Sequence, residues 1–298
     1  MSGSGEVYLP GEREVYHSGE RTAQALAGER ERPDRLGRAI SATIPPVAAA
    51  FLAERQIIAV AAADAAGRMW ATLLSGPPGF VSVPDERTIL ITATPAAGDP
   101  LAEVLSRPAA VGTIALEPAT RRRMRLNGRA EPTPDGLRVT AEQVFSNCPK
   151  YIQRRSPVAA PRRTSRPATH AAQLSTAQQL IVSSADTFFI STADDAGHAD
   201  ASHRGGNPGF VQVLGPRRLR WPDYRGNGAF MTLGNLESNP AAGLVFPVWE
   251  TGGLLLLTGA ARTDWTERGV EFLIDETVEL AAAVPLIWSE PEYSPANP

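Results

Sequence analysis

The spacing of hydrophobic residues changes along the chain, and the change separates a helical start from a series of short strands. Over residues 12–40, apolar residues recur at helical spacing among charged ones and the segment ends near Pro33, which predicts a helical arm. The segment 46–55 (PVAAAFLAER) predicts a second, short helix. Short β-branched and alternating runs follow, divided by turns rich in glycine and proline. The predicted strands of this first series are 56–62, 68–74, 80–83, 88–92, 110–116 and 123–130.

A second series repeats this order of strands and turns. The sequence GRMWATLLSGPPGFVSV, from residue 67, matches GHADASHRGGNPGFVQV, from residue 197. Corresponding Gly79 and Gly209 are 130 residues apart, and Gly128 and Gly259 are 131 apart. A unit of this length is a domain rather than a solenoid repeat, and two copies are expected to form a pseudo-twofold pair. The second series comprises strands 186–192, 198–204, 210–214, 218–222, 242–249 and 253–260, with a short helix over 230–236.

These patterns predict a mainly β protein with short helices (α+β), built from two tandem six-stranded domains. A Pro-, Ser- and Arg-rich stretch between the copies is typical of an exposed linker. The expected organisation is a helical arm over 1–45, a first domain over 46–155, a linker over 156–170 and a second domain over 171–298.

Composition narrows the class of protein. An apolar content of 43% over 298 residues is too high for a disordered chain, and a net charge of −3 argues against a nucleic-acid-binding protein held by bulk charge. One cysteine cannot form an internal disulfide, and no Cys/His cluster has the spacing of a metal site, so no metal is expected. No apolar run reaches 18 residues and the start does not resemble a signal peptide, which together predict a cytoplasmic protein without a membrane partner.

The two copies differ where chemistry is expected. The second copy has Ser202, His203 and Arg204 on a strand where the first has Leu73-Leu74-Ser75. Ser202 and Arg204 are expected on one face, where an arginine fork and a hydroxyl suit a phosphate group. His203 is a candidate general acid or base, or a packed histidine. The alternative for the whole triplet is an edge strand with solvated polar groups.

A glycine-rich turn follows in the second copy, before the predicted helix 230–236. The turn contains Tyr224, Arg225 and Asn227. The corresponding turn of the first copy, TPAAGDP (94–100), has an acid instead of the arginine and the asparagine. Backbone N–H groups of such a turn can converge on an anion. The alternative is a plain turn.

Basic and aromatic residues near the end of the first copy are further candidates. Arg121, Arg123 and Arg125 alternate at the start of a strand, which indicates a solvated face or an ion network between the copies. Lys150 and Tyr151 are candidates for contacting a phosphate or a ring. No nucleophile elbow, Walker loop, dinucleotide fingerprint or HExxH motif occurs, so no catalytic residue is assigned.

Taken together, several of these segments resemble the pyridoxamine 5'-phosphate oxidase-related, FMN-binding split-barrel superfamily, in particular its tandem members. The segments are YHSGE, GRMWATLLSGPPGF, RRRMRLNG, NCPKYIQRR, DASHRGGNPGFVQV, WPDYRGNG and LGNLESNPAAGLVF. The resemblance implies two six-stranded split barrels with FMN at their contact. It implies that the 202–204 triplet and the 224–227 turn hold the FMN phosphate. Simpler members place Ser and Lys in that turn. Because the first copy lacks both elements, its site is expected to be degenerate, with one FMN per chain.

The function implied is that of an FMN-dependent oxidoreductase acting on a small molecule, with NAD(P)H as a candidate reductant. Some members hold haem or a deazaflavin instead. The alternatives are a non-catalytic flavin-binding or electron-transfer module and a cofactor-free scaffold. A homodimer or an intrachain pseudo-dimer is expected, with neither nucleic acid nor membrane as partner.

Overall fold

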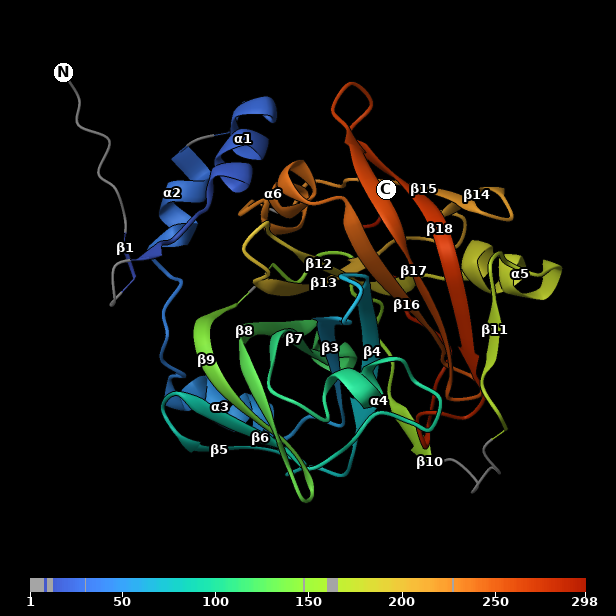
Figure 1. Cartoon of the computed structure of the whole chain (residues 1–298), viewed down its shortest axis with the longest axis horizontal. Helices are drawn as coiled ribbons and strands as arrows, with labels where there is room; N and C mark the ends of the chain where they lie inside the picture. Colours follow the sequence, from blue (N-terminus) through green and yellow to red (C-terminus); the bar gives the residue numbers. More distant parts are fainter. Residues whose placement is uncertain (1–7, 10–12, 30, 147, 160–165, 227) are drawn as a thin grey trace.

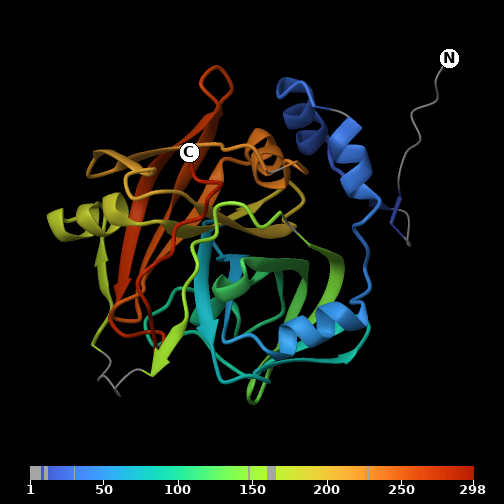
Figure 2. The same ribbon diagram turned by 180° about the vertical axis from the view of Figure 1, so that it is seen from behind.

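A computed structural model describes residues 8–9, 13–29, 31–146, 148–159, 166–226 and 228–298. It is mainly β, with two large antiparallel sheets and short helices. The arm comprises β1 (Tyr8–Leu9), β2 (Arg13–Glu14), α1 (Ser18–Leu26) and α2 (Glu31–Gly37). The helix α1 lies against α6 (Met231–Ser238) of the second half of the chain (Figures 1 and 2).

The first barrel is a seven-stranded antiparallel sheet in the order β4-β3-β7-β8-β9-β6-β5. The helix α3 (Pro46–Ala53) precedes it. Its elements are β3 (Ile57–Ala63), β4 (Met69–Ser75), β5 (Val81–Asp85), β6 (Thr88–Ile91), α4 (Leu101–Val104), β7 (Ala109–Glu117), the 3₁₀ turn Pro118–Thr120, β8 (Arg122–Thr133) and β9 (Gly136–Ser146).

The second barrel repeats this arrangement in the order β13-β12-β16-β17-β18-β15-β14, with β11 added alongside β18. The helix α5 (Thr176–Ser184) precedes it, as α3 precedes the first. Its strands are β12 (Thr187–Ala193), β13 (Ala199–Gly205), β14 (Gln212–Gly215), β15 (Arg218–Pro222), β16 (Ala241–Val248), β17 (Gly253–Asp264) and β18 (Gly269–Leu280).

The strand order confirms the internal repeat. Each barrel also carries a register shift at the same place in its long hairpin, at Gly128 in β8 and at Gly259 in β17. A Cβ at Gly128 would collide with the carbonyl oxygen of Thr140, and one at Gly259 with that of Leu273. Both copies therefore need glycine at the bulge, which explains why these residues kept their spacing in the sequence.

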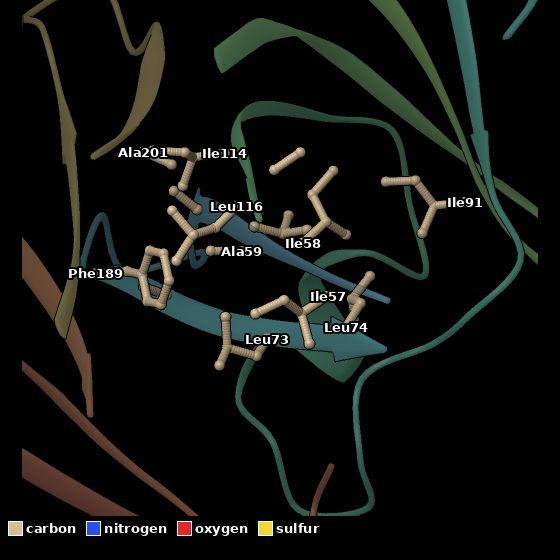
Figure 3. Close-up of a cluster of buried hydrophobic side chains, with 14 of the residues drawn as sticks. Ile57, Ile58, Ala59, Leu73, Leu74, Ile91, Ile114, Leu116, Phe189 and Ala201 are labelled. Atoms are coloured by element: carbon tan, nitrogen blue, oxygen red, sulfur yellow. The ribbon is translucent and has the colours of Figure 1, made fainter. Parts of the chain in front are cut away.

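The hydrophobic core of the first barrel continues into the second barrel, which also has a core of its own. Figure 3 shows Phe189 and Ala201 of the second barrel among Ala59, Leu73 and Ile114 of the first, and all five are buried. The contact is made by β13 against β3 and β7, and by β16 and β17 against β4. The sheets are thus joined by continuous apolar packing, and polar groups at this contact are held in a rigid setting.

Three details of the sequence-based prediction differ from the structure. Each sheet has seven or more strands instead of six, because β9 and β18 form the second arms of long hairpins with β8 and β17. The arm does not end near Pro33, which lies in the first turn of α2, where proline's missing N–H costs no hydrogen bond. The stretch expected as a linker includes β10 (Pro157–Ala159), paired with β19 (Leu286–Trp288), and most of β11 (Thr169–Ala171).

Candidate functional site

Ser202, His203 and Arg204 lie on β13, the strand at the end of the second sheet that faces the first barrel. The Arg204 Nη1 atom donates to the Ser202 hydroxyl at 2.7 Å and to the carbonyl of His203 at 3.2 Å. Ser202 and Arg204 therefore share a face of the strand, as its alternation predicts. The hydroxyl fixes the orientation of the guanidinium.

Arg123 of β8 reaches His203 from the first barrel. Its Nη1 lies 2.8 Å from Nδ1 of His203, which is buried with its ring edge against Phe189. Burial, with the positive charges of Arg123 and Arg204, holds the pKa of His203 well below its ordinary value, so the imidazole is neutral at pH 7. Because a guanidinium only donates, Nδ1 must accept, and the imidazole proton is assigned to Nε2.

Three buried nitrogen atoms in this group have no hydrogen-bond partner among the described residues. They are Nε of Arg123, Nε2 of His203 and Nη2 of Arg204. All three are donors in the protonation states assigned above. A buried donor without an acceptor costs about 1–3 kcal/mol, so a group with several acceptor oxygens would stabilise this arrangement.

Positive charge is in excess at this place. Burial, with repulsion from Arg204, lowers the pKa of Arg123 to about 9, and burial also lowers the pKa of Arg204. Both remain charged at pH 7. Asp223, the acid that lines the same cavity, is ion-paired with Arg268 at 3.2 Å. An anion between Arg123 and Arg204 would relieve their repulsion and accept their free N–H groups.

The turn after β15 closes the cavity from the other side. The Tyr151 hydroxyl donates to the carbonyl of Arg225 at 2.7 Å, and the rings of Tyr151 and Tyr224 lie 5.2 Å apart. Tyr151 holds a left-handed backbone (φ 66°), which is unusual for a residue with a side chain. Gly226 lies close to Tyr151 and to the aliphatic stem of Lys150. The end of the first copy and the turn of the second therefore meet.

The cavity enclosed by these groups has a volume of about 30 Å³, room for about two water molecules. Arg123, Tyr151, His203, Arg204 and Tyr224 line it. Its donors fit the oxygens of a phosphate group. Its size is sufficient for the phosphate end of a nucleotide but not for the sugar or the base.

The pseudo-symmetric position in the other half of the contact is apolar. With the offsets of 130 residues for β4 and 131 for β8, His203 corresponds to Leu73, Arg204 to Leu74 and Arg123 to Leu254. The sequence-based pairing of the 202–204 triplet with residues 73–75 was therefore wrong by one residue. The three leucines are buried in the core that continues from the first barrel into the second. The buried donors are therefore confined to one of two equivalent places.

The structure brings together most of the residues singled out from the sequence. Tyr151, His203, Arg204 and Tyr224 line one cavity, Ser202 orients Arg204, and Lys150 borders Gly226. The side chain of Arg225 is exposed, and the residue contributes its carbonyl instead. Asn227 lies outside the described residues.

Sequence reasoning missed Arg123 and Asp223 as lining residues. Arg123 was noticed for its alternation with Arg121 and Arg125, but an alternating basic run does not reveal which residue it faces across the barrels. Asp223 directly precedes Tyr224 in the glycine-rich turn, and this position in the sequence was the signal that could have identified it as a lining residue.

Comparison with known proteins gives one family match. Residues 44–172 match the model of the pyridoxamine 5'-phosphate oxidase family. No curated protein matches the chain. Among solved structures, the FAD binding protein from Mycobacterium smegmatis has 17% identity and a TM-score of 0.26, covering 38% of this chain and 97% of that one. HupZ of Group A Streptococcus has 13% identity and a TM-score of 0.27, covering 34% and 88%.

The fold and its two related sheets define a tandem split-barrel protein. Over the first barrel, less than half of its length, the chain is similar to the pyridoxamine 5'-phosphate oxidase family, and the second barrel repeats the strand order of the first. Among the described residues, the structure has no helix with the length and apolar character needed to cross a membrane.

Proposed function

We propose that the chain binds one FMN and is an FMN-dependent oxidoreductase acting on a small molecule, with the FMN phosphate between Arg123, His203 and Arg204. The observation that carries this proposal is the set of three buried donors without acceptors, drawn from both barrels around one small cavity. A phosphate group has the charge and the number of acceptors to satisfy them.

Each residue has a defined part in holding the cofactor. Arg204, oriented by Ser202, offers its free Nη2 to a phosphate oxygen, and His203 offers the proton on Nε2. Arg123 donates from the other barrel, so the bound phosphate lies across the contact and both halves are needed. When bound, the flavin supplies electron or hydride transfer, while the protein supplies binding, orientation and local charge.

The pairing of the two barrels bears on how many chains the site needs. Because β8 and β13 of one chain form the site, a second chain is not needed to complete it. The proposed reductant is NAD(P)H, the substrate is a small molecule in the cytoplasm, and neither nucleic acid nor a membrane takes part.

The test compares FMN with riboflavin, which lacks the phosphate, by fluorescence titration of the apoprotein. Arg204→Ala and Arg123→Ala are expected to weaken FMN binding about tenfold or more, because a charged hydrogen bond contributes about 1.5–3 kcal/mol, and to leave riboflavin binding nearly unchanged. The matched control is Arg218→Ala, an exposed arginine of the same barrel paired with Glu271. Equal losses for both ligands, or no loss for FMN, would show that the phosphate lies elsewhere.

Anaerobic mixing of the FMN-loaded protein with NADPH or NADH tests the catalytic half of the proposal. Bleaching of the flavin absorbance, followed by reoxidation on adding an acceptor, is the expected result. Tight FMN binding without reduction by either nucleotide contradicts the proposed reductant. Failure to reoxidise with any small-molecule acceptor after chemical reduction favours the flavin-binding module.

A further inference from the structure

A second, larger cavity lies on the other side of Arg123. It has a volume of about 400 Å³, within the range of small-molecule sites. One wall is α3, with Val47, Ala48 and Phe51, and the other is the start of β8 and the end of β9. Arg123 lines this cavity and the phosphate cavity alike, so a molecule held here would lie next to the proposed flavin site.

The walls of this cavity are apolar and its charge is positive. Met124 and Phe145 line it together with Phe51, and all three side chains are buried. The guanidinium of Arg122 lies 4.9 Å from the centre of the Phe51 ring. This combination suits a flat apolar body with an acidic group at one end.

Of the three arginines that line the cavity, Arg122 is the one without a side-chain hydrogen bond or ion pair within the described part of the chain. Arg123 is bonded to His203 and also lines the phosphate cavity. Arg121 donates to the carbonyl of Ile152 and is paired with Glu292. Glu117, the acid whose charge Arg122 feels, is already ion-paired with Arg55 at 2.9 Å. A single uncommitted guanidinium matches a singly charged carboxylate.

The fold itself does not require these arginines. The second barrel has an equivalent cavity of about 690 Å³ between α5 and the ends of β17 and β18. There Ile181 takes the place of Phe51, Gly253 that of Arg122 and Leu254 that of Arg123, at the offsets of the repeat. Arg166 and Glu279 also line that cavity, an arginine accompanied by an acid. The pair formed by Arg122 and Arg123 therefore belongs to one copy, the copy whose cavity adjoins the phosphate site.

We infer that the cavity of the first barrel binds the substrate, and that this substrate is a planar apolar carboxylate whose carboxylate group meets Arg122. That this ligand is a substrate rests on the proposed function. The binding itself depends only on the residues of the cavity.

The experiment measures binding of 2-naphthoate and of uncharged 2-naphthamide to the full chain by calorimetry, with and without saturating FMN. Arg122→Ala is expected to weaken 2-naphthoate binding about tenfold and to leave 2-naphthamide binding unchanged, and Arg122→Lys is expected to recover part of the loss. The matched control is Arg129→Ala, an exposed arginine further along the same strand, which should change neither.

Three results would overturn the inference: no detectable binding of 2-naphthoate, equal affinity for the two probes, or displacement of 2-naphthoate by FMN. The last would mean that the cavity holds the flavin itself. Failure of the proposed function has a different signature, because FMN then binds independently of Arg204 while 2-naphthoate still depends on Arg122. Arg122→Ala leaves FMN affinity unchanged if the two sites are separate.

Discussion

Arg125 of β8 and Asp200 of β13 form an ion pair across the contact between the barrels, with side chains exposed by only 1% and 4%. Asn127 also donates to Asp200, at 3.1 Å. The alternating arginines of the sequence therefore do take part in an ion network between the two copies. Nε and Nη1 of Arg125 and Oδ2 of Asp200 have no further partner among the described residues, so the pair is only partly compensated for its burial.

Replacing one partner of this pair is expected to lower the free energy of unfolding more than replacing both partners with apolar residues. Asp200→Leu leaves the Arg125 charge buried and unpaired and should lower the free energy of unfolding by about 3–5 kcal/mol. The double variant Arg125→Met with Asp200→Leu should recover most of that loss, because two apolar side chains avoid the desolvation of both charges. Urea unfolding of the single and double variants measures this. A double variant as unstable as Asp200→Leu would show that the pair itself stabilises the contact.

The fold was predictable from the sequence because the turns of the two copies share their spacing. The bulge glycines Gly128 and Gly259 kept an offset of 131 since no other residue fits against the opposing carbonyl. The strands β9 and β18 were missed, although each alternates in burial along its outer half. Their charged residues, such as Arg138 and Glu271, face outward and obscured the strand pattern.

The candidate site was predictable only where its residues follow one another in the chain. Ser202 and Arg204 could be placed on one face because a strand alternates. Arg123 could not be paired with His203, since the two are separated by 80 residues and meet only when the barrels pack. Contacts of that kind depend on the pairing of two sheets, which no local pattern specifies.

Close backbone contact between the barrels predicts a second effect on stability. A Cβ at Gly112 of β7 would collide with the backbone nitrogen of Ala201, and one at Gly243 of β16 with the carbonyl oxygen of Met69. Gly112→Ala and Gly243→Ala should each lower the free energy of unfolding by about 1–3 kcal/mol, as overpacking does. Gly215→Ala is the control, because nothing lies within 4 Å of its added Cβ. Chemical denaturation compares them, and losses no larger than the control's would argue against tight packing of the barrels.

A buried carboxyl predicts a pH effect. Burial raises the pKa of Asp99 to about 6 from 3.8, against the opposing effect of hydrogen bonds from Thr72 and from the Leu101 N–H. Between these two pH values the folded state binds more protons than the unfolded state, so stability falls as pH rises. The fall attributable to Asp99 should be roughly 2–3 kcal/mol between pH 4 and pH 6.

Asp99→Asn isolates that effect because other carboxyl groups titrate in the same range. The asparagine keeps an acceptor for the Leu101 N–H and does not ionise. The difference in unfolding free energy between the variant and the original chain should therefore grow in favour of the variant as pH rises from 4 to 6. A difference that stays constant over this range would mean that Asp99 is ionised in the folded protein at low pH.

The asymmetry of the contact predicts the flavin stoichiometry. Leu73, Leu74 and Leu254 occupy the places that correspond to His203, Arg204 and Arg123, and they offer no donor to a phosphate. The chain should therefore take up one FMN and not two. Flavin released by denaturing the saturated protein, divided by the protein concentration, measures the ratio.

A double variant that removes both arginines from the proposed phosphate site tests whether the bound FMN depends on them. Arg204→Leu with Arg123→Leu gives the second barrel's site the apolar character of the leucine position, and FMN uptake under the same conditions should fall from one equivalent toward zero. Riboflavin binding provides the control for the ring, since it does not use the phosphate donors. Two equivalents of FMN in the original chain, or an undiminished single equivalent in the double variant, would place the flavin phosphate away from Arg123 and Arg204.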